Sequence, residues 1–235
     1  MRQGRRTMTS RISDPSLPSL FATVLPRSDI GSPSDALERG LRALGFERIA
    51  GIDEAGRGPL AGPVVAAAVI LDLSHVPKGL NDSKKLKAHE RERLFVEILA
   101  TAQVGVGTAG AAEIDRVNIR QATLNAMRRA LAGLAVPPAH ALIDGRDVPP
   151  RLGCPAAAVI GGDAQSLSIA AASIVAKVTR DRMMTRLCTA HPAYGFGRHM
   201  GYGTAAHMAV IETDGPCAHH RRSFAPIAAR LSRGS

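Results

Sequence analysis

The sequence predicts one mixed α/β domain, and three observations support that fold class. The chain has 235 residues and 45% hydrophobic side chains, enough for a single large domain with its own core. Apolar runs and segments of helical spacing alternate along it, with three strands, a helix, two strands and a helix, and a further helix after the second strand. Neither a GxGxxG motif nor a Walker A loop is present, which argues against a doubly wound nucleotide-binding sheet.

The first two strands are expected to form an antiparallel hairpin. Residues 48–53 are a short apolar run, residues 62–71 are a longer one rich in Val and Ala, and the link between them is rich in glycine. The spacing of Leu94 and Ile98 predicts a helix over 87–101. The later elements are expected in this order: a strand at 103–108, a helix at 111–134, strands at 139–143 and 156–160, and helices at 168–188 and 204–213.

Residues 1–46 are predicted to be an N-terminal tail. They show no sustained period, so we expect disorder over about 1–33 and at most a short helix at 34–44. The tail carries seven Arg and four acidic residues, a net +3 out of the +10 of the whole chain. The basic charge therefore belongs mainly to the predicted folded domain at 47–235, which includes a C-terminal helical part.

Composition narrows the class of protein. A net charge of +10 with no Trp and only five Phe and two Tyr indicates a polyanionic partner that is not held mainly by aromatic stacking. No apolar run approaches the roughly 20 residues of a membrane span, and residues 1–19 lack the apolar core of a secretory signal. Three widely spaced cysteines without a CxxC pair fit a reducing cytoplasm better than a disulfide scaffold.

Acidic residues follow three of the predicted strands where each strand ends. Asp53 and Glu54 end the first strand, Asp144 ends the fourth, and Asp163 follows the fifth after two glycines. Neighbouring strands lie about 4.8 Å apart, so carboxylates at adjacent strand ends can converge. Such a group needs a counter-charge, and oxygen ligands favour Mg²⁺ or Mn²⁺ over Zn²⁺. The alternative is that each acid only forms a turn, but three strand ends in a basic chain favour a metal site.

Glycines lie beside this predicted metal site. Gly56 and Gly58 flank Arg57, and residues without side chains let backbone N–H and C=O groups approach a substrate closely. Such contacts could recognise a ribose 2′-hydroxyl and so distinguish RNA from DNA. The alternative is an ordinary tight turn before the second strand.

Two basic stretches are candidate phosphate contacts. The first is Ser83, Lys84 and Lys85, where Ser83 could also cap the helix that follows. The second is Ser173, Lys177 and Arg180, which share one helical face at i, i+4 and i+7. A solvated helix start and a solvated helix face are the respective alternatives.

The histidines are not expected to bind a metal. His191, His199 and His207 are spaced by eight residues, which is not metal-ligand spacing, although one of them could contact a phosphate or shuttle a proton. The adjacent His219 and His220 would need further partners to converge on one ion.

The sequence resembles the ribonuclease HII family, the type 2 ribonucleases H. The resemblance runs from about residue 47 to 228 and rests on ordered blocks: GIDEAGRGPLAGPVV at 51–65, NDSKKL at 81–86, LIDG at 142–145, AASIVAKVTRD at 171–181, YGF at 194–196, His199, GYGT at 201–204 and HRRSF at 220–224. It implies a ribonuclease H-like fold, a five-stranded mixed sheet flanked by helices. It also implies endonucleolytic hydrolysis of RNA in RNA–DNA hybrids and cutting at ribonucleotides embedded in duplex DNA, hence a role in replication and ribonucleotide excision repair.

The family motifs also suggest roles for individual residues. The match implies that the catalytic, metal-binding carboxylates are Asp53, Glu54, Asp144 and Asp163, and that the Gly56-Arg57-Gly58 backbone and Tyr202 read the 2′-hydroxyl. Asp181 is a rival for the fourth carboxylate, but it lies about three turns into a predicted helix. The chain departs from the family at Gly162 and Met200, where lysines are usual, which could weaken substrate binding or alter the preference between long hybrids and single ribonucleotides.

The expected chemistry is phosphodiester hydrolysis with two divalent ions, Mg²⁺ or Mn²⁺, about 3.5–4 Å apart, giving 3′-hydroxyl and 5′-phosphate ends. Two other readings remain. A basic nucleic-acid-binding domain with structural acids would bind duplexes without hydrolysis, and a DNA-directed nuclease or recombinase would cut all-DNA duplexes. A cytoplasmic monomer is the default expectation.

Overall fold

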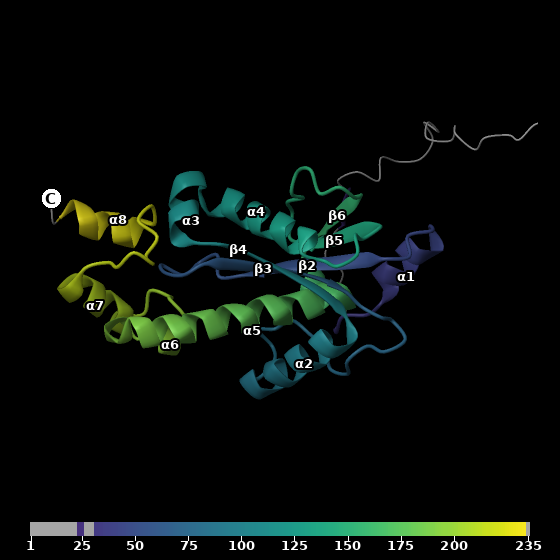
Figure 1. Cartoon of the computed structure of the whole chain (residues 1–235), viewed down its shortest axis with the longest axis horizontal. Coiled ribbons are helices and arrows are strands. Elements are labelled where there is room, and N and C mark those ends of the chain that lie inside the picture. Colours follow the sequence, from purple (N-terminus) through teal and green to yellow (C-terminus); the bar gives the residue numbers. More distant parts are fainter. Residues whose placement is uncertain (1–22, 26–30, 234–235) are drawn as a thin grey trace, which may run out of the picture.

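A mixed β-sheet between two layers of helices forms the centre of the structure (Figure 1). The computed structural model describes residues 23–25 and 31–233. The six described strands are ordered β1-β6-β5-β2-β3-β4. Their bounds are β1 Thr23–Leu25, β2 Ile49–Ala55, β3 Val64–Ile70, β4 Gln103–Ala109, β5 His140–Asp144 and β6 Ala156–Val159. All five strands predicted from the sequence are present, and β1 is an addition.

Strand directions bring the acidic strand ends to one edge of the sheet. β2 and β3 form the predicted antiparallel hairpin, in which Asp53 is paired with Ala67. β2 and β5 are parallel, with Ile52 opposite Ile143, and β6 runs parallel to β5. Because the carboxyl ends of parallel strands meet at the same edge, the residues that follow β2, β5 and β6 are neighbours.

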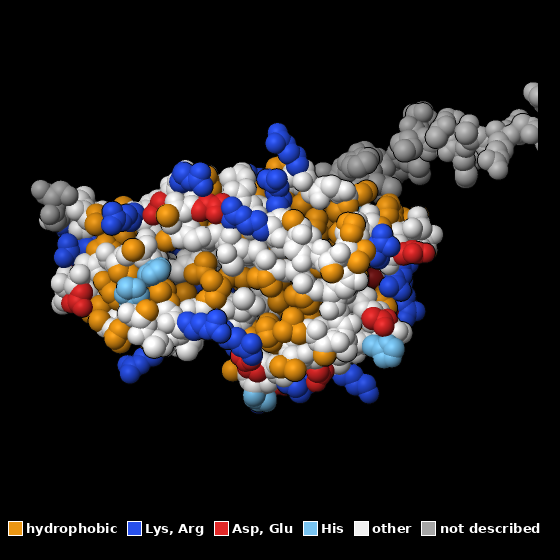
Figure 2. Space-filling model, in the orientation of Figure 1, with side chains coloured by type: hydrophobic (Ala, Val, Ile, Leu, Met, Phe, Trp, Pro, Cys, Tyr) orange, Lys and Arg blue, Asp and Glu red, His pale blue; other side chains and the backbone are white. Residues whose placement is uncertain are grey.

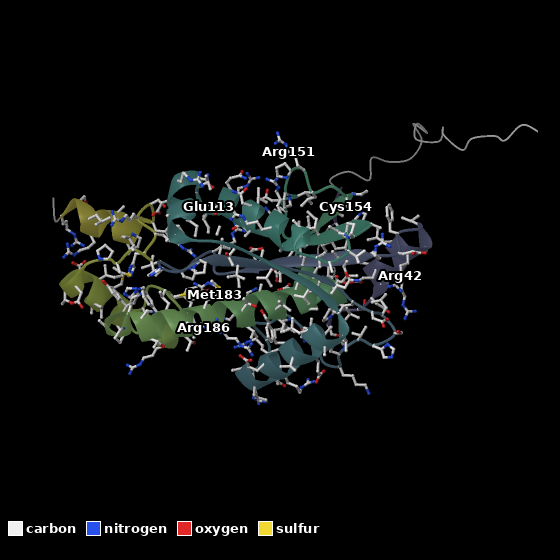
Figure 3. All side chains as sticks on the ribbon, in the orientation of Figure 1. Arg42, Glu113, Arg151, Cys154, Met183 and Arg186 are labelled. Carbon is white, nitrogen blue, oxygen red and sulfur yellow. The ribbon has the colours of Figure 1, made fainter. Side chains whose placement is uncertain are left out.

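Helices cover both faces of the sheet. On one face lie α3 (Ala111–Val117) and α4 (Ile119–Ala132), and on the other lie α2 (Ala88–Thr101) and the long α5 (Leu167–Ala190) (Figure 1). Their apolar side chains fill the space between helix and sheet (Figure 3). The shorter elements are α1 Ala36–Ala43, η1 Gly162–Ala164, η2 Pro192–Tyr194, α6 Phe196–His199, α7 Ala205–Asp214 and α8 Ala225–Ser232.

The sequence of α5 lets it lie very close to the sheet. Its first turns contain Ala170, Ala171 and Ala172, all fully buried. Opposite them is Gly51 of β2, where an added Cβ would come within 2.1 Å of the Ser168 carbonyl carbon. Small residues on both elements therefore allow the close approach that holds α5 against the strand carrying the first acids.

The predicted helix at 111–134 is two helices. Asn118, with φ +67°, ends α3 and caps α4, where its side chain accepts a hydrogen bond from the Gln121 N–H. Asn tolerates this left-handed conformation better than most residues, and its carbonyl oxygen satisfies an unpaired amide of the new helix. The apolar spacing on both sides of Asn118 is similar, so periodicity alone did not reveal the break.

Two segments of the predicted tail belong to the fold. β1 pairs with β6, and Ser34 forms a bridge with Ser166. Glu38 of α1 is buried and accepts hydrogen bonds from the Ser166 hydroxyl at 2.6 Å and the Ser168 N–H at 2.9 Å. The boundary predicted at residue 47 is thus too late, because these contacts are made with residues distant in sequence. Disorder was predicted over about 1–33, and most of that range, residues 1–22 and 26–30, lies outside the described residues.

The surface agrees with the charge expected for the domain. Lys and Arg side chains occur around the outline of the face in Figure 2, with Asp and Glu interspersed among them. Basic charge is therefore spread over the folded part of the chain. Among the described helices, none combines the length and apolarity that crossing a bilayer requires.

Candidate active site

Three carboxylates meet at the edge of the sheet. Asp53 lies in β2, Asp144 ends β5 and Asp163 lies in η1, and one oxygen of each is within 4.8 Å of the others. Backbone amides hold two of them, since Asp53 Oδ1 accepts from the Glu54 N–H at 2.6 Å and Asp144 Oδ1 accepts from the Gly162 N–H at 2.7 Å. The convergence predicted from the strand ends is found for these three residues.

Glu54 lies beside this group without joining it. Its Oε1 accepts from Arg57 Nη1 at 3.3 Å, and its side chain is 13% exposed. Adjacent residues of a strand point to opposite faces, so Glu54 approaches the cavity from a different side than Asp53. Asp181, the rival for a fourth position, is occupied by an ion pair with Lys177 at 2.8 Å.

The carboxylates repel one another in a buried place. Burial raises the pKa of Asp53 well above its usual value, and the charges of Glu54 and Asp144 raise it further. Burial also raises the pKa of Asp144, although the Gly162 N–H opposes this, and burial followed by the Asp144 charge raises the pKa of Asp163. A cation among them would offset this repulsion and favour their ionised forms, and an all-oxygen set of donors suits a hard divalent ion. The residues therefore fit Mg²⁺ or Mn²⁺.

Lys84 supplies a nearby positive charge. Its Nζ is 3.6 Å from Asp163 Oδ2 and 3.8 Å from Asp82 Oδ1. Partial burial lowers the pKa of Lys84, but Asp82 and Asp163 outweigh it, so the pKa is raised. The side chain is 77% exposed, so it does not replace a cation inside the carboxylate group and remains able to reach a phosphate.

A cavity of about 300 Å³ opens next to the carboxylates. It is lined by Asp53, Glu54, Ala55, Gly56, Arg57, Gly58, Ser83, Lys84, Asp144, Ser173, Lys177, Arg180 and Tyr202. Most predicted site residues thus lie together. Asp163 does not line the cavity itself but lies next to Asp53 and Asp144, which do. Lys85 is exposed and does not line the cavity.

A larger hollow of about 710 Å³ lies elsewhere, lined partly by Arg151 and Cys154 of the loop between β5 and β6 (Figure 3). Its described lining contains Arg128 and Arg129 but no Asp or Glu. It offers no carboxylate for a cation, so the smaller cavity is the candidate active site.

The two serines of the cavity form one hydrogen-bonded unit. Ser173 Oγ donates to Ser83 Oγ at 2.7 Å and accepts from the Ser83 N–H at 3.3 Å. Ser83 does not cap α2, because that helix begins at Ala88, after Lys87. The unit instead ties the loop at 81–86 to α5. Because the Ser83 hydroxyl accepts from Ser173, its own hydrogen can be donated to another group.

Arg180 is not the phosphate contact that helical spacing suggested. It is 1% exposed, and its guanidinium donates to the carbonyls of Pro63, Ala61 and Met200 at 2.9, 3.3 and 3.0 Å. The predicted phosphate-facing stripe on α5 is therefore reduced to Ser173 and Lys177. Helical spacing identified the face of the helix but not what covers it.

The segment at 56–62, called the glycine loop here, has a closed side and an open side. Gly56 has φ +94°, and an added Cβ would lie 1.9 Å from Arg180 Nε, so only glycine fits there. An added Cβ at Gly58 would meet nothing closer than Tyr202 Cε1 at 3.8 Å. The Tyr202 side chain is 49% exposed. Gly58 and the Tyr202 ring therefore lie side by side on the cavity wall, and both are open to a ligand in the cavity.

The structure explains one of the two departures from the family pattern, Gly162, and gives no reason for methionine at position 200. Gly162 is buried, and an added Cβ would lie 2.5 Å from Ile169 Cδ1 and 3.1 Å from Val159 Cβ, so the packing of this chain favours glycine. Met200 has φ +51°, and its carbonyl accepts from Arg180. Arg221, which is fully buried against the glycine loop, is a residue that sequence reasoning missed.

Comparison with known proteins agrees with the site. A family model described as Ribonuclease HII matches residues 50–227. A protein named Ribonuclease HII from Agrobacterium fabrum (strain C58 / ATCC 33970) is 58% identical over 217 residues, covering 92% of this chain and 98% of that protein. Another from Rhizobium johnstonii is 60% identical over 195 residues, covering 83% of this chain and 85% of that protein.

Solved structures support the same assignment. The ribonuclease H2 from Pyrococcus horikoshii OT3 has a TM-score of 0.67 and 27% identity, and covers 79% of this chain and 98% of its own. A chain of the PCNA:RNase HII complex from Archaeoglobus fulgidus has a TM-score of 0.65 and 29% identity, with 75% and 95% coverage. The fold is thus the ribonuclease H-like fold predicted from the sequence. Because the family model spans most of the chain and the curated relatives align over most of their length, this chain belongs to the ribonuclease HII family and is a metal-dependent endoribonuclease.

Proposed function

We propose that the chain hydrolyses the RNA strand of RNA–DNA hybrids and cuts at ribonucleotides embedded in duplex DNA, leaving 3′-hydroxyl and 5′-phosphate ends. The observation that carries the proposal is the adjacency of two features. The carboxylates of Asp53, Asp144 and Asp163 meet within 4.8 Å, and the open side of the glycine loop lines the cavity beside them. The first feature suits a metal-dependent hydrolase, and the second suits a close backbone contact with ribose.

The carboxylates are proposed to hold two divalent ions, with Mg²⁺ or Mn²⁺ as candidates. Asp53, Asp144 and Asp163 form the oxygen-only donor set, and Glu54 adds a fourth carboxylate at the cavity wall. When bound, the ions lower the pKa of an attacking water and stabilise the charge of the leaving 3′-oxygen. The backbone amides on Asp53 and Asp144 orient these carboxylates, so the ligand geometry is set before an ion arrives.

Ribose recognition is assigned to the loop and the tyrosine. Without a side chain at Gly58 the loop backbone is open to the cavity, and the Tyr202 ring lines the cavity next to it. Ser83, Lys84, Lys85, Ser173 and Lys177 are proposed to contact phosphates: Lys84 and Lys177 line the cavity, and Lys85 acts from its rim. Phosphate contacts place the duplex, while the loop and the tyrosine decide whether a ribonucleotide is present.

One assay separates the candidate functions. The substrates are a duplex with one ribonucleotide, a long RNA–DNA hybrid and an all-DNA duplex, each with Mg²⁺, Mn²⁺ or EDTA, and the end groups of the products are identified. We expect cleavage of the first two only, with metal, giving 3′-hydroxyl and 5′-phosphate ends. A cyclic phosphate, cutting of all-DNA duplexes, or binding without cleavage would each reject the proposal.

Gly58→Ala tests the open side of the loop. Its Cβ would make only an ordinary contact with the Tyr202 ring, so stability should be unchanged, but the methyl group would fill the space proposed for the sugar. We expect kcat/KM on the single-ribonucleotide duplex to fall about 10- to 100-fold, as a displacement of about 1 Å does in a positioned site. Unaltered kcat/KM in a folded Gly58→Ala variant would remove the loop from substrate recognition.

The remaining expectations are proposals of the same kind. Ribonucleotide cutting would serve DNA replication and ribonucleotide excision repair. The three cysteines are free, which suits a reducing cytoplasm. A monomer is proposed because the cavity is built from one copy of the chain.

A further inference from the structure

We infer that two consecutive residues near the C-terminus, His220 and Arg221, position the two halves of the ribose-reading surface: Arg221 holds the glycine loop, and His220 holds Tyr202 through His207. The inference rests on the proposed function of that surface. His220, Arg221 and His207 are buried and do not line the cavity, so they act as positioning residues.

Arg221 binds the glycine loop through backbone carbonyls. Its Nη1 donates to the Arg57 carbonyl at 2.7 Å, its Nη2 to the carbonyls of Gly56 at 2.5 Å and Gly62 at 2.9 Å, and its Nε to Gly62 at 3.1 Å. Its own N–H donates to the Leu60 carbonyl at 2.8 Å. One fully buried guanidinium thus fixes both ends of the loop.

These contacts determine which way the loop's amides point. A trans peptide unit directs its C=O and the following N–H to opposite sides, and the described chain contains no cis peptide bond. With the carbonyls of Gly56 and Arg57 turned toward Arg221, the N–H groups of Arg57 and Gly58 face the other way. Arg221 therefore presents two successive donors on the side away from itself, the arrangement that an oxygen-rich ligand needs.

Tyr202 is held by a hydrogen-bonded chain whose proton positions follow from its ends. The Tyr202 carbonyl can only accept, so His207 Nδ1, 2.9 Å away, carries a hydrogen. In a neutral ring His207 Nε2 must then accept, and His220 Nε2, 3.0 Å away, must donate. That leaves His220 Nδ1 as an acceptor, and the Cys217 N–H donates to it at 3.0 Å. Each ring nitrogen of His207 and His220 is therefore either a donor or an acceptor, and its role is fixed by its neighbour.

The burial of both rings favours this neutral arrangement. Burial, followed by the neighbouring His207, lowers the pKa of His220 to about 4, and burial also lowers the pKa of His207. A second proton on His207 Nε2 would face the His220 N–H at 3.0 Å, and one on His220 Nδ1 would face the Cys217 N–H at 3.0 Å. His199 stacks on His207 with ring centroids 4.2 Å apart, which restricts tilting of the His207 ring.

The two halves are also joined to each other. The Leu60 N–H donates to the Gly201 carbonyl at 2.8 Å, and Arg180 bridges the carbonyls of Ala61 and Met200. Because His220 and Arg221 are adjacent, a shift in their segment moves the loop and Tyr202 together. Their relative position, which decides whether a 2′-hydroxyl fits between them, is thereby maintained.

The loop half is tested with Arg221→Lys and Arg221→Gln, and Arg222→Ala is the matched control. Arg222 is exposed, and the hydrogen bond that it donates to Asp115 comes from its backbone N–H, which alanine keeps. Lysine keeps the charge but cannot form the four bonds of the fork, so we expect both Arg221 variants to lose kcat on the single-ribonucleotide duplex by about 10- to 100-fold with a smaller change in KM. Arg222→Ala should keep kcat. Arg221→Lys at the parental kcat would overturn this half of the inference.

The tyrosine half is tested with His207→Asn and His207→Leu. Both variants lose the bond to His220, but the asparagine amide can still donate to the Tyr202 carbonyl near the position of Nδ1. We expect His207→Asn to retain kcat within about threefold and His207→Leu to lose about tenfold, in line with the loss of one intramolecular hydrogen bond. Equal kcat values for the two variants would overturn this half, whatever their stabilities.

Amide hydrogen exchange without substrate gives a readout independent of activity. Peptides covering 56–62 and 201–204 should exchange faster in Arg221→Lys and His207→Leu respectively, and at the parental rate in Arg222→Ala. If the parent fails to cut at a ribonucleotide, the proposed function is wrong while the exchange data still judge the positioning. If neither Arg221 variant folds, the His207 pair decides.

Discussion

Two groups of buried charges lie a short way apart in this protein, and they are balanced in opposite ways. Asp53 and Asp163 are 4% and 7% exposed, and they face one another and Asp144. Arg180 and Arg221 are 1% and 0% exposed, and no carboxylate in the described part of the chain forms a salt bridge with either. Burial lowers the pKa of both arginines, to about 9 for Arg221, but backbone carbonyls accept several hydrogen bonds from each, whereas the acids have two amides and the exposed Lys84.

The difference comes from what each charge can bond. A guanidinium has five N–H donors, and backbone carbonyls accept three hydrogen bonds from Arg180 and four from Arg221, so most of their donors are paired. A carboxylate only accepts, and few amides reach the acids, so their mutual repulsion remains. The acids therefore need a cation to offset their repulsion, whereas the arginines are already hydrogen-bonded to backbone carbonyls. Removing one charge from each group should therefore have opposite effects on the stability of the metal-free protein.

The largest expected effect is that of Asp53→Asn on activity. The amide removes one charge from the donor set, so we expect metal-dependent cleavage to fall by at least about 10³-fold, equivalent to about 4 kcal/mol of transition-state stabilisation. The metal-free variant should nevertheless unfold at a higher temperature, because one repelling charge is gone. The measurements are single-turnover cleavage and thermal unfolding in EDTA. Full Mg²⁺-dependent cleavage by the variant would remove Asp53 from the mechanism.

Replacing an arginine should do the reverse. Arg180→Met leaves three buried carbonyls without a donor, so the free energy of unfolding should fall by about 3 kcal/mol. The matched control is Arg182→Met on the same helix, where the arginine is half exposed and paired with Glu92, and the loss should be below about 1 kcal/mol. Urea denaturation of both variants measures the difference. Equal losses would mean that the carbonyl contacts of Arg180 add nothing.

The stability of the metal-free protein should depend on pH through the acids. Their folded pKa values are raised, so the folded state holds more protons than the unfolded state, and stability falls as pH rises from about 4 through those raised values. Mg²⁺ at 100 times its Kd should restore about 2.7 kcal/mol at high pH and less at low pH, where protons compete with it. Thermal unfolding between pH 5 and 8, with Mg²⁺ or EDTA, tests this. A Mg²⁺ effect independent of pH would contradict the assignment.

The smallest effect concerns charges that are not buried. Lys84→Ala should reduce the salt dependence of duplex binding by about one unit of slope, since its exposed ammonium is proposed to contact one phosphate. Lys85→Ala should behave alike if it acts from the rim, and the double variant should show the sum. Binding is measured in EDTA over a range of salt concentrations. An unchanged slope in the double variant would remove both lysines from the interface.

The sequence alone determined the sheet and the acids. The meeting of Asp53, Asp144 and Asp163 also needed β2, β5 and β6 to be neighbours, which the sheet order decided, but alternating apolar runs specify strands and strand ends are where carboxylates reach the surface. The ordered motifs specified the family. These are properties of the chain that need no knowledge of how distant segments pack.

Only the tertiary structure decided what surrounds those elements. Arg221 reaches Gly56 across 165 positions of sequence, and Glu38 reaches Ser166 across 128, so no local pattern marks either contact. Helical spacing placed Arg180 on the correct face, but a solvated arginine and one buried among carbonyls have the same sequence signature. Burial of a polar group depends on the segment that covers it, and that segment is chosen by the fold as a whole.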